Sequence, residues 1–277
     1  MALKLMYITN NPDVAKIAEE SGVDRIFVDM EYIGKGERQG GMDTVQSSHT
    51  VEDIRKVKAA LRSAEVLVRI NPLHHAYKGI TGSQEEINAV IDAGADVIML
   101  PYFTTVKEVK EFIRLVGGRA KTLPLIESKR SVELIDKILN VDGIDELFIG
   151  LNDLSIDYNK KFMFELLSDG TVEKLCLKFR LKGIPYGFGG IAALGKGLLP
   201  SEYIIREHYR LGSTCAILSR SFCNANHFTD LEAIRNIFEN GMQGIRYFEK
   251  ECEERIGYFR ENEKAIAEKI QAIVENI

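Results

Sequence analysis

The chain has 277 residues, of which 45% are hydrophobic and 28% are charged, and its formal net charge at pH 7 is −5. Because nucleic acids require a basic protein face, this acidic balance argues against a nucleic-acid partner. No run of about 18 apolar residues could span a bilayer, and the N-terminus lacks a basic segment followed by an apolar one. The four cysteines are scattered without a CxxC pair. We therefore expect reduced thiols in a cytoplasmic protein.

Short apolar runs alternate with amphipathic segments along most of the chain. We expect strands at Leu3–Ile8, Arg25–Asp29, Glu65–Ile70, Asp96–Leu100, Lys121–Ile126, Glu146–Gly150, Ile184–Phe188 and Cys215–Leu218. We expect helices between them at Pro12–Ser21, Val51–Arg62, Ser83–Ala93, Val106–Val116 and Val132–Leu139. Repeated strand–helix units form parallel sheets. Eight units without a long linker predict one α/β domain over residues 1–277, a (β/α)8 TIM barrel whose active site lies on the loops after the strands.

The C-terminal segment, residues 242–277, contains no predicted strand. Its apolar residues recur at spacings of three and four, as in an amphipathic helix: Ile245, Phe248, Cys252, Ile256, Phe259, Ile266, Ile270, Ile273 and Ile277. An apolar stripe of this length has to be buried. We expect this helical extension to pack either on its own barrel or on a neighbouring subunit of a homo-oligomer.

Two acidic residues follow adjacent predicted strands. Glu127 comes after the fifth strand and Asp153 after the sixth, so both are expected at the mouth of the barrel. Two such carboxylates can share a hard divalent cation, with water or substrate oxygens completing its coordination. The alternative is that each carboxylate stabilises the start of the next helix.

Arg69 stands near the end of an otherwise apolar strand, where a buried guanidinium requires an anion. It is suited to bind a carboxylate or an enolate oxygen in a forked geometry. The alternative is a structural salt bridge to Glu127, Asp29 or Glu31. At the end of the second strand, Asp29 is a candidate for orienting other groups, and Glu31 is a candidate catalytic residue that holds a metal-bound water.

Residues 33–50 form a long, polar, glycine-rich segment after the second strand. Loops of this length in a compact barrel are usually functional, as lids or substrate clamps, although a disordered insertion is the alternative. The segment carries Arg38, a candidate for substrate binding, and His49, a candidate for proton transfer.

The sequence resembles the HpcH/HpaI aldolase and citrate lyase β-subunit family, within the phosphoenolpyruvate/pyruvate barrel superfamily. The matching motifs stand in the family's order and cover roughly residues 20–160: GVDRIFVDMEY, VRINP, GADVIMLPYFTTVKEVKEF, LPLIESKRSVELIDKIL and VDGIDELFIGLNDLS. The resemblance implies that Glu127 and Asp153 ligate Mg²⁺ or Mn²⁺ and that Arg69 stabilises a pyruvate-type enolate. This agrees with the chemistry, because a Lewis acid and a cation stabilise the negative charge that carbon–carbon cleavage creates.

The sequence also departs from the family pattern. In the aldolase branch a histidine involved in proton transfer follows the acidic motif of strand two, and here that position is Tyr32. Tyrosine is a poor general base near neutral pH, so His49 is the candidate to replace it. After strand eight, Arg220 is expected to bind a second anionic group of the substrate or to form a structural salt bridge. Asn152 is a further candidate for substrate contact.

Two other motifs in the sequence indicate different kinds of binding site. GFGGIA, residues 187–192, matches the dinucleotide fingerprint, but it lies late in the chain and further glycines interrupt the helix that it should open. A glycine-rich loop at the anion site of a barrel is the better interpretation. His74 and His75 are adjacent, as in some transition-metal sites, but a surface loop is favoured because no third histidine lies nearby.

We therefore predict a divalent-metal-dependent carbon–carbon lyase, an aldolase that acts on a 2-oxo acid or a similar small-molecule carboxylate. One alternative is a CoA-thioester lyase of the citrate lyase β-subunit type. The other is a non-catalytic barrel that binds a metabolite, because a fold alone does not determine function.

Overall fold

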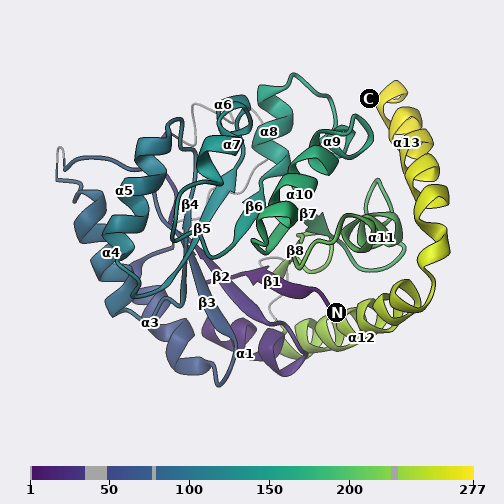
Figure 1. Ribbon diagram of the computed structural model, residues 1–277. Coiled ribbons are helices and arrows are strands. Elements are labelled where there is room, and N and C mark those ends of the chain that lie inside the picture. The colour runs from purple at the N-terminus through teal and green to yellow at the C-terminus, as the bar shows by residue number, and fades with distance from the viewer. Residues whose placement is uncertain (1, 35–48, 77–78, 226–229) are drawn as a thin grey trace.

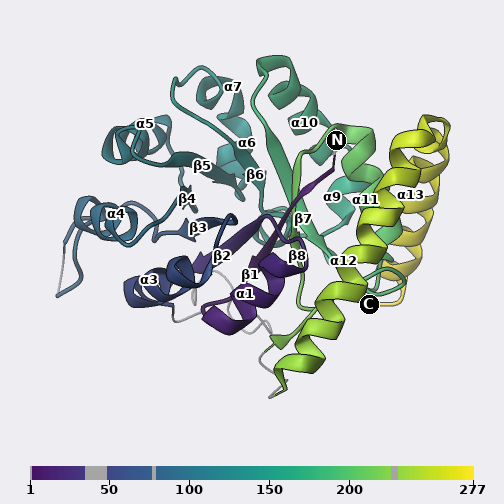
Figure 2. The ribbon, with the colours of Figure 1, turned by 90° about the horizontal axis from the view of Figure 1, so that it is seen from below.

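The computed structural model describes residues 2–34, 49–76, 79–225 and 230–277. Parallel strands close into a barrel in chain order, with β8 pairing to β1. The strands are β1 Lys4–Ile8, β2 Arg25–Asp29, β3 Glu65–Arg69, β4 Val97–Leu100, β5 Lys121–Ile126, β6 Leu147–Ile149, β7 Tyr186–Ile191 and β8 Cys215–Leu218. Figures 1 and 2 show helices surrounding this ring of strands. The predicted (β/α)8 barrel is confirmed.

The surrounding helices include the five predicted ones, of which four begin at the predicted residue and end within two residues of the predicted limit, and the fifth, Val132–Leu139, is divided into α6 and α7. They are α1 Pro12–Glu20, α3 Val51–Ala60, α4 Ser83–Asp92, α5 Val106–Val116, α6 Lys129–Glu133, α7 Ile135–Ile138, α8 Leu151–Asp157, α9 Glu165–Ser168, α10 Thr171–Lys182, α11 Ser201–Leu211, α12 Leu231–Glu254 and α13 Phe259–Glu275. Capping boxes fix the starts of α3 at Thr50, of α5 at Thr105 and of α6 at Ser128. Within the described ranges, no helix combines the length and apolarity that a bilayer crossing requires.

The interior of the barrel has a charged layer at each end and an apolar layer between them. On a strand, every second side chain points to the same face. In β2 this places Arg25, Phe27 and Asp29 in succession along the interior. The middle layer is a separate apolar cluster of Met6, Phe27, Leu67, Val97, Met99, Leu123, Leu125, Phe148 and Cys215. This apolar layer separates the two charged ends of the barrel.

An ion network closes the end where the strands begin. Arg25, whose side chain is 0% exposed, donates from Nη1 and Nη2 to the two carboxylate oxygens of Glu146, at 2.9 and 2.8 Å. Its Nη2 also contacts Glu65 Oε2 at 2.6 Å. Lys4 and Lys121 complete the network with ion pairs to Glu65 at 3.4 and 2.5 Å. Since each buried charge has a partner, this end of the barrel contributes to stability and offers no unpaired group for chemistry.

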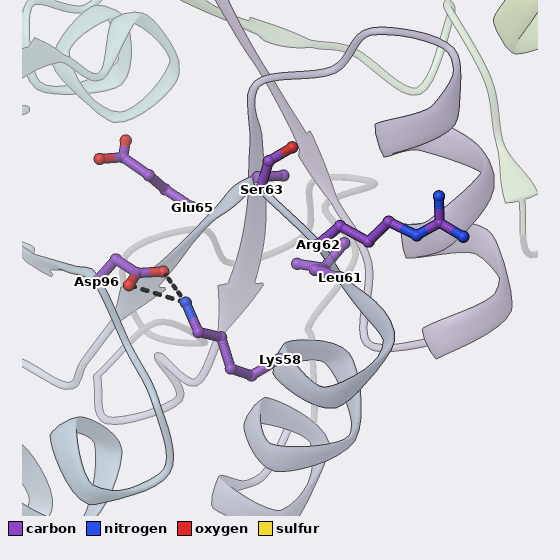
Figure 3. Close-up of a pocket in the computed structure, with 7 residues that line it drawn as sticks. Lys58, Leu61, Arg62, Ser63, Glu65 and Asp96 are labelled. Atoms are coloured by element: carbon purple, nitrogen blue, oxygen red, sulfur yellow. Dashed lines mark hydrogen bonds and ion pairs between the residues drawn. The ribbon is translucent and has the colours of Figure 1, made fainter.

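A small pocket of about 110 Å³ lies beside the same end of the barrel. Figure 3 shows the Lys58 ammonium group reaching Asp96, and its distances to the two carboxylate oxygens are 2.8 and 2.6 Å. Lys58 and Asp96 pair with each other, and Glu65, which also lines the pocket, belongs to the ion network. Because the active sites of barrels lie at the opposite face, this pocket is not a candidate active site.

The C-terminal segment forms two helices, where the sequence predicted one. α12 begins at Leu231, and a short 3-10 turn, Ile256–Tyr258, separates it from α13. α13 lies beside α11 and α9 of the same chain (Figures 1 and 2). Its Ile266 and Ile270 are buried there, so part of the predicted apolar stripe packs on its own barrel. Docking on a neighbouring subunit stays a prediction.

The glycines of the GFGGIA motif lie within β7, which extends to Ile191 and not only to the predicted Phe188. A Cβ atom at Gly187 would lie 2.3 Å from the backbone oxygen of Cys215 on β8. A Cβ atom at Gly189 would lie 2.8 Å from Leu151. These glycines are therefore explained by close packing inside a strand, and the strand-to-helix turn of a dinucleotide site is not formed at this motif.

We predict that Arg25→Ala lowers the free energy of unfolding by about 3–5 kcal/mol, because it leaves Glu65 and Glu146 without their buried partner. Urea unfolding followed by circular dichroism measures the effect. Arg55→Ala is the matched control, since Arg55 forms an exposed pair with Glu52 and its loss is expected to cost less than about 1 kcal/mol. Equal losses in the two variants would contradict the prediction.

Candidate functional site

At the mouth of the barrel, Asp29 and Arg69 form a forked ion pair across neighbouring strands. β2 and β3 pair in register with Asp29 opposite Arg69. Arg69 Nε and Nη2 each donate to one carboxylate oxygen of Asp29, both at 2.8 Å. The guanidinium lies 5.6 Å from the ring centre of Phe27, on top of the apolar layer. Although burial would lower the pKa of Arg69, the carboxylates of Asp29, Glu31 and Glu127 raise it, so the cation is held in its charged form.

Glu127 follows β5 and is only 3% exposed. Burial, together with the nearby carboxylates of Glu31 and Asp153, raises the pKa of its carboxyl group to about 8, against the opposing effect of the Arg69 guanidinium. One carboxylate oxygen, Oε1, accepts a hydrogen bond of 2.8 Å from the backbone N–H of Tyr102. The carboxyl group is thus fixed in place but costly to ionise.

The candidate site contains more negative than positive side chains. The acidic side chains are Asp29, Glu31, Glu127 and Asp153. The basic side chain among them is Arg69, whose pKa is raised by Asp29, Glu31 and Glu127. Arg69 Nε also lies 3.4 Å from Glu31 Oε2. Within the described residues, no three His, Cys, Asp or Glu side chains form a preassembled metal-binding group. The donors are therefore a set of carboxylate oxygens that would need further oxygen ligands to complete a metal's coordination.

His49 reaches the mouth from the end of the segment that follows β2. Its Nδ1 accepts a hydrogen bond of 3.0 Å from the backbone N–H of Asp29. The backbone oxygen of Phe27 accepts a hydrogen bond from the backbone N–H of Thr9, which follows β1. Backbone groups two residues apart on a strand point to the same side, so the N–H of Asp29 also points toward β1. The imidazole therefore occupies the edge of the mouth just beyond the last residue of β1. A neutral ring that accepts at Nδ1 carries its proton at Nε2.

A buried pair at the end of β3 fixes the start of the segment after β2. The Asn71 side-chain oxygen accepts hydrogen bonds of 3.0 Å from the backbone N–H groups of Tyr32 and Ile33. Its side-chain nitrogen donates to Glu86 at 2.8 Å. The Tyr32 side chain is 56% exposed, so the backbone at Tyr32 is fixed while its ring faces solvent.

Comparison with known proteins shows the family to which the chain belongs. The model of the HpcH/HpaI aldolase/citrate lyase family matches residues 4–162, which is more than half of the chain. The chain belongs to the HpcH/HpaI aldolase/citrate lyase family. The match spans β1 to α8, and it therefore includes the ends of β2, β3, β5 and β6, which carry the acidic residues and Arg69.

Among curated members of the family, the identity is low. A hydroxypyruvate/pyruvate aldolase of Roseovarius nubinhibens is 24% identical over 143 residues, covering 41% of this chain and 54% of that protein. A 2-keto-3-deoxy-L-rhamnonate aldolase of Escherichia coli is 25% identical over 173 residues, covering 51% and 57%. The chain thus spans little more than half the length of the curated relatives it matches.

Solved structures of the family share the fold over most of the chain. The HpcH/HpaI aldolase of Desulfitobacterium hafniense has a TM-score of 0.61 at 20% identity, and it covers 88% of this chain and 93% of its own. A family protein of Burkholderia cenocepacia has the same TM-score at 15% identity, covering 84% and 94%. The barrel therefore continues through the region beyond residue 162, where the family model ends.

The other predicted substrate-binding residues lie in different settings. Asn152 is exposed in the first turn of α8 and donates to Asp153 at 3.2 Å. Arg220 is exposed just after β8. Arg38 lies outside the described residues. The two ring nitrogens of His74 contact the backbone oxygens of Pro72 and Thr81 at 2.8 Å, which fits the surface-loop interpretation.

Two backbone features of the site were not predicted from the sequence. One is the N–H of Tyr102, which binds Glu127. The other is Gly150, where an added Cβ atom would lie 2.9 Å from Glu127 Cβ and 3.2 Å from Oε2. The glycine before LNDLS is visible in the sequence, but its contact with Glu127 depends on the register of β5 and β6.

We predict that Glu127 makes the stability of the EDTA-treated protein depend on pH. Its folded pKa of about 8 lies above the ordinary value of 4.5, so the folded chain keeps a proton that the unfolded chain loses. This contribution is complete below pH 4.5 and is lost as the pH rises to 8, by at most roughly 1.4 kcal/mol per pKa unit. Urea unfolding between pH 5 and 8.5 is expected to show a smaller loss in Glu127→Gln, which cannot ionise.

Glu133→Gln is the control for this experiment, because Glu133 is exposed and pairs with Arg130 on the surface of α6. It is expected to keep the pH slope of the wild type. An unchanged slope in Glu127→Gln would show that Glu127 is ionised at neutral pH in the folded protein.

Proposed function

We propose that the protein is a divalent-metal-dependent aldolase that breaks or forms a carbon–carbon bond beside the carbonyl group of a 2-oxo acid, through a pyruvate-type enolate. The observation that carries the proposal is the buried carboxyl group of Glu127, held at the barrel mouth in the electrostatic field of Glu31, Asp153 and Arg69. Relatives of the family that are named as aldolases support the reaction class.

The residues at the mouth fit a hard divalent cation. All candidate donors are carboxylate oxygens, which suit Mg²⁺ or Mn²⁺. Because neighbouring carboxylates and burial oppose the ionisation of Glu127, a divalent cation would offset the excess negative charge. Glu127 and Asp153 would hold it, leaving positions for the oxygens of a substrate. When bound, the ion supplies Lewis-acid stabilisation of the charge that develops on the substrate.

Arg69 is placed to stabilise the enolate as a second cation. Asp29 occupies its Nε and Nη2 donors and fixes the plane of the guanidinium. Within the described residues, Nη1 forms no hydrogen bond, so this nitrogen can donate to an oxygen of the substrate. A donor fixed before the reaction stabilises developing charge without a cost for reorientation. Asp29 is accordingly a positioning residue for Arg69.

His49 is proposed as the group that moves the proton, in the role for which Tyr32 is poorly suited. In cleavage, a base takes the proton of the hydroxyl group on the carbon that becomes the aldehyde, and the electrons of the carbon–carbon bond form the enolate. The enolate carbon then takes a proton. An imidazole has a pKa near the operating pH for both transfers. Because Nε2 carries the proton of the neutral ring, Nδ1 is the nitrogen that takes the hydroxyl proton, and its hydrogen bond to the Asp29 N–H has to open for the transfer.

The substrate is proposed to be a small carboxylate whose far end lies toward Arg220 and Asn152. Both side chains are exposed beside the mouth, after β8 and β6. Arg220 can bind a second anionic group in a forked geometry. Arg38 belongs to the same proposal, although it lies outside the described residues.

We expect the protein to exchange the methyl protons of pyruvate with deuterated water in the presence of Mg²⁺ or Mn²⁺, because exchange requires the enolate but no aldehyde. Proton NMR follows the loss of the methyl signal. EDTA is expected to stop the exchange, and Glu127→Gln is expected to slow it by more than about 100-fold, as loss of a group that stabilises the transition state does. Glu133→Gln is expected to exchange at the wild-type rate. Absence of exchange with every divalent metal would overturn the proposal.

A second pair of variants distinguishes His49 from Tyr32. His49→Gln is expected to slow exchange by about 10²–10⁴-fold, the usual contribution of a general acid or base, and to leave the affinity for Mn²⁺ within about threefold of wild type. Tyr32→Phe is expected to change neither quantity, because its ring faces solvent. The opposite result, with Tyr32→Phe slow and His49→Gln fast, would assign the proton transfer to the tyrosine.

A further inference from the structure

Tyr102, two residues after the end of β4, has an unusual backbone conformation. Of the described residues other than glycine, Tyr102 and Asn159 have a positive φ, at 39° and 54°. Asparagine adopts this left-handed region several times more often than most residues, whereas a bulky aromatic residue rarely does. Such strain persists only when the surrounding structure enforces it, and it is concentrated at functional sites.

The strained backbone directs the Tyr102 N–H to Glu127. β4 ends at Leu100, and the next residue, Pro101, has no N–H to donate. The N–H of Tyr102 is thus the first donor available after the strand, and it binds Glu127 Oε1 at 2.8 Å. The hydrogen bond crosses from the end of β4 to the end of β5.

The other side of the Glu127 carboxyl group faces bare backbone. An added Cβ atom at Gly150, after β6, would lie 3.2 Å from Oε2, the carboxylate oxygen that Tyr102 does not bind. Glu127 therefore stands between a donor from the strand before it and a glycine from the strand after it. The carboxylate is therefore held by a hydrogen bond on one side, and the lack of a side chain at Gly150 leaves room for it on the other.

We propose that Tyr102 is a positioning residue, whose left-handed backbone presents its N–H to Glu127 and orients that carboxylate for a divalent cation. The inference rests on the proposed function, because it assigns Glu127 to the metal. It adds that Glu127 is oriented before the metal binds, and that the main chain of the loop after β4 provides this orientation. A carboxylate fixed before binding loses less freedom when it coordinates an ion, so the affinity depends on this hydrogen bond.

The test replaces the single N–H. Incorporation of the α-hydroxy acid analogue of tyrosine at position 102 converts the amide into an ester, which removes the donor and keeps the side chain. Mn²⁺ affinity, measured by the electron paramagnetic resonance of free Mn²⁺, is expected to fall by about tenfold or more, as for loss of a hydrogen bond to a charged group. The matched control is the same change at the exposed Thr104, whose N–H donates to Glu108 at 3.0 Å, and it is expected to leave the affinity unchanged.

Two side-chain variants test the backbone conformation. Tyr102→Gly keeps the N–H and adopts a positive φ without strain, so its Mn²⁺ affinity is expected to stay within about twofold of wild type. Tyr102→Val keeps the N–H but disfavours this conformation, and its affinity is expected to fall by about fivefold. Cooperative thermal unfolding verifies that each variant is folded.

The outcomes separate this inference from the proposed function. If the wild type binds Mn²⁺, Glu127→Gln does not, and the Tyr102 ester binds it with unchanged affinity, the metal site is supported and the role of Tyr102 is overturned. Equal losses in the esters at positions 102 and 104 would overturn it too, because the effect would then be general. Absence of Mn²⁺ binding in wild type would overturn the metal in the proposed function and this inference with it.

Discussion

Charged side chains in the interior of the barrel can exist only where other groups compensate for the loss of water, and this constraint organises the molecule. Alternation along the strands points every second residue inward, and the apolar layer around Phe27 leaves no room for charge between the two ends. Charge is therefore confined to the two ends of the strands. Each end has an arginine bound in forked geometry to a carboxylate, Arg25 to Glu146 and Arg69 to Asp29.

The two ends differ in the balance of charge. Where the strands begin, Glu65 and Glu146 are matched by Arg25 and by two lysines, and the carboxyl pKa values of both acids are lowered despite the opposing effect of burial. Where the strands end, the pKa of Glu127 is raised to about 8, because burial and like charges outweigh the nearby guanidinium. Strongly perturbed ionisation of this kind is concentrated at functional sites. The imbalance supports the mouth as the candidate active site, independently of the position of active sites in other barrels.

The features that depend on strand periodicity could be predicted from the sequence. Three strands, Arg25–Asp29, Lys121–Ile126 and Cys215–Leu218, have the predicted limits, and the positions of Glu127 and Asp153 after their strands follow from the same pattern. The strand at β7 was predicted to end too early, because Gly189 and Gly190 indicated a loop, although the lack of a side chain at Gly189 allows close packing against Leu151. A glycine gives the same local signal in a loop and in a closely packed strand, and only the tertiary contacts distinguish the two.

Contacts made by the backbone could not be predicted. The positive φ of Tyr102 is disfavoured for its residue type, so local preference argued against the conformation that places its N–H on Glu127. The break between α12 and α13 likewise follows no change in the apolar spacing. At Tyr102 the surrounding structure outweighs local preference, which a single sequence does not report. At the helix break Gly257 is a local signal, but the apolar spacing on both sides of it favoured one continuous helix.

The division between strands and loops also limits what the relatives indicate about the substrate. The ends of β2, β3, β5 and β6 carry Asp29, Arg69, Glu127 and Asp153, and all lie within residues 4–162, the part that matches the family model. In the proposed reaction these residues would act on the carbons and oxygens that every 2-oxo acid shares. Arg220 follows β8, beyond that region, and His49 comes from a loop instead of the position that Tyr32 occupies. Arg220, one of the residues proposed to contact the variable end of a substrate, lies beyond the matched region, so the similarity to the relatives informs the chemistry of the proposed site more than it informs the substrate.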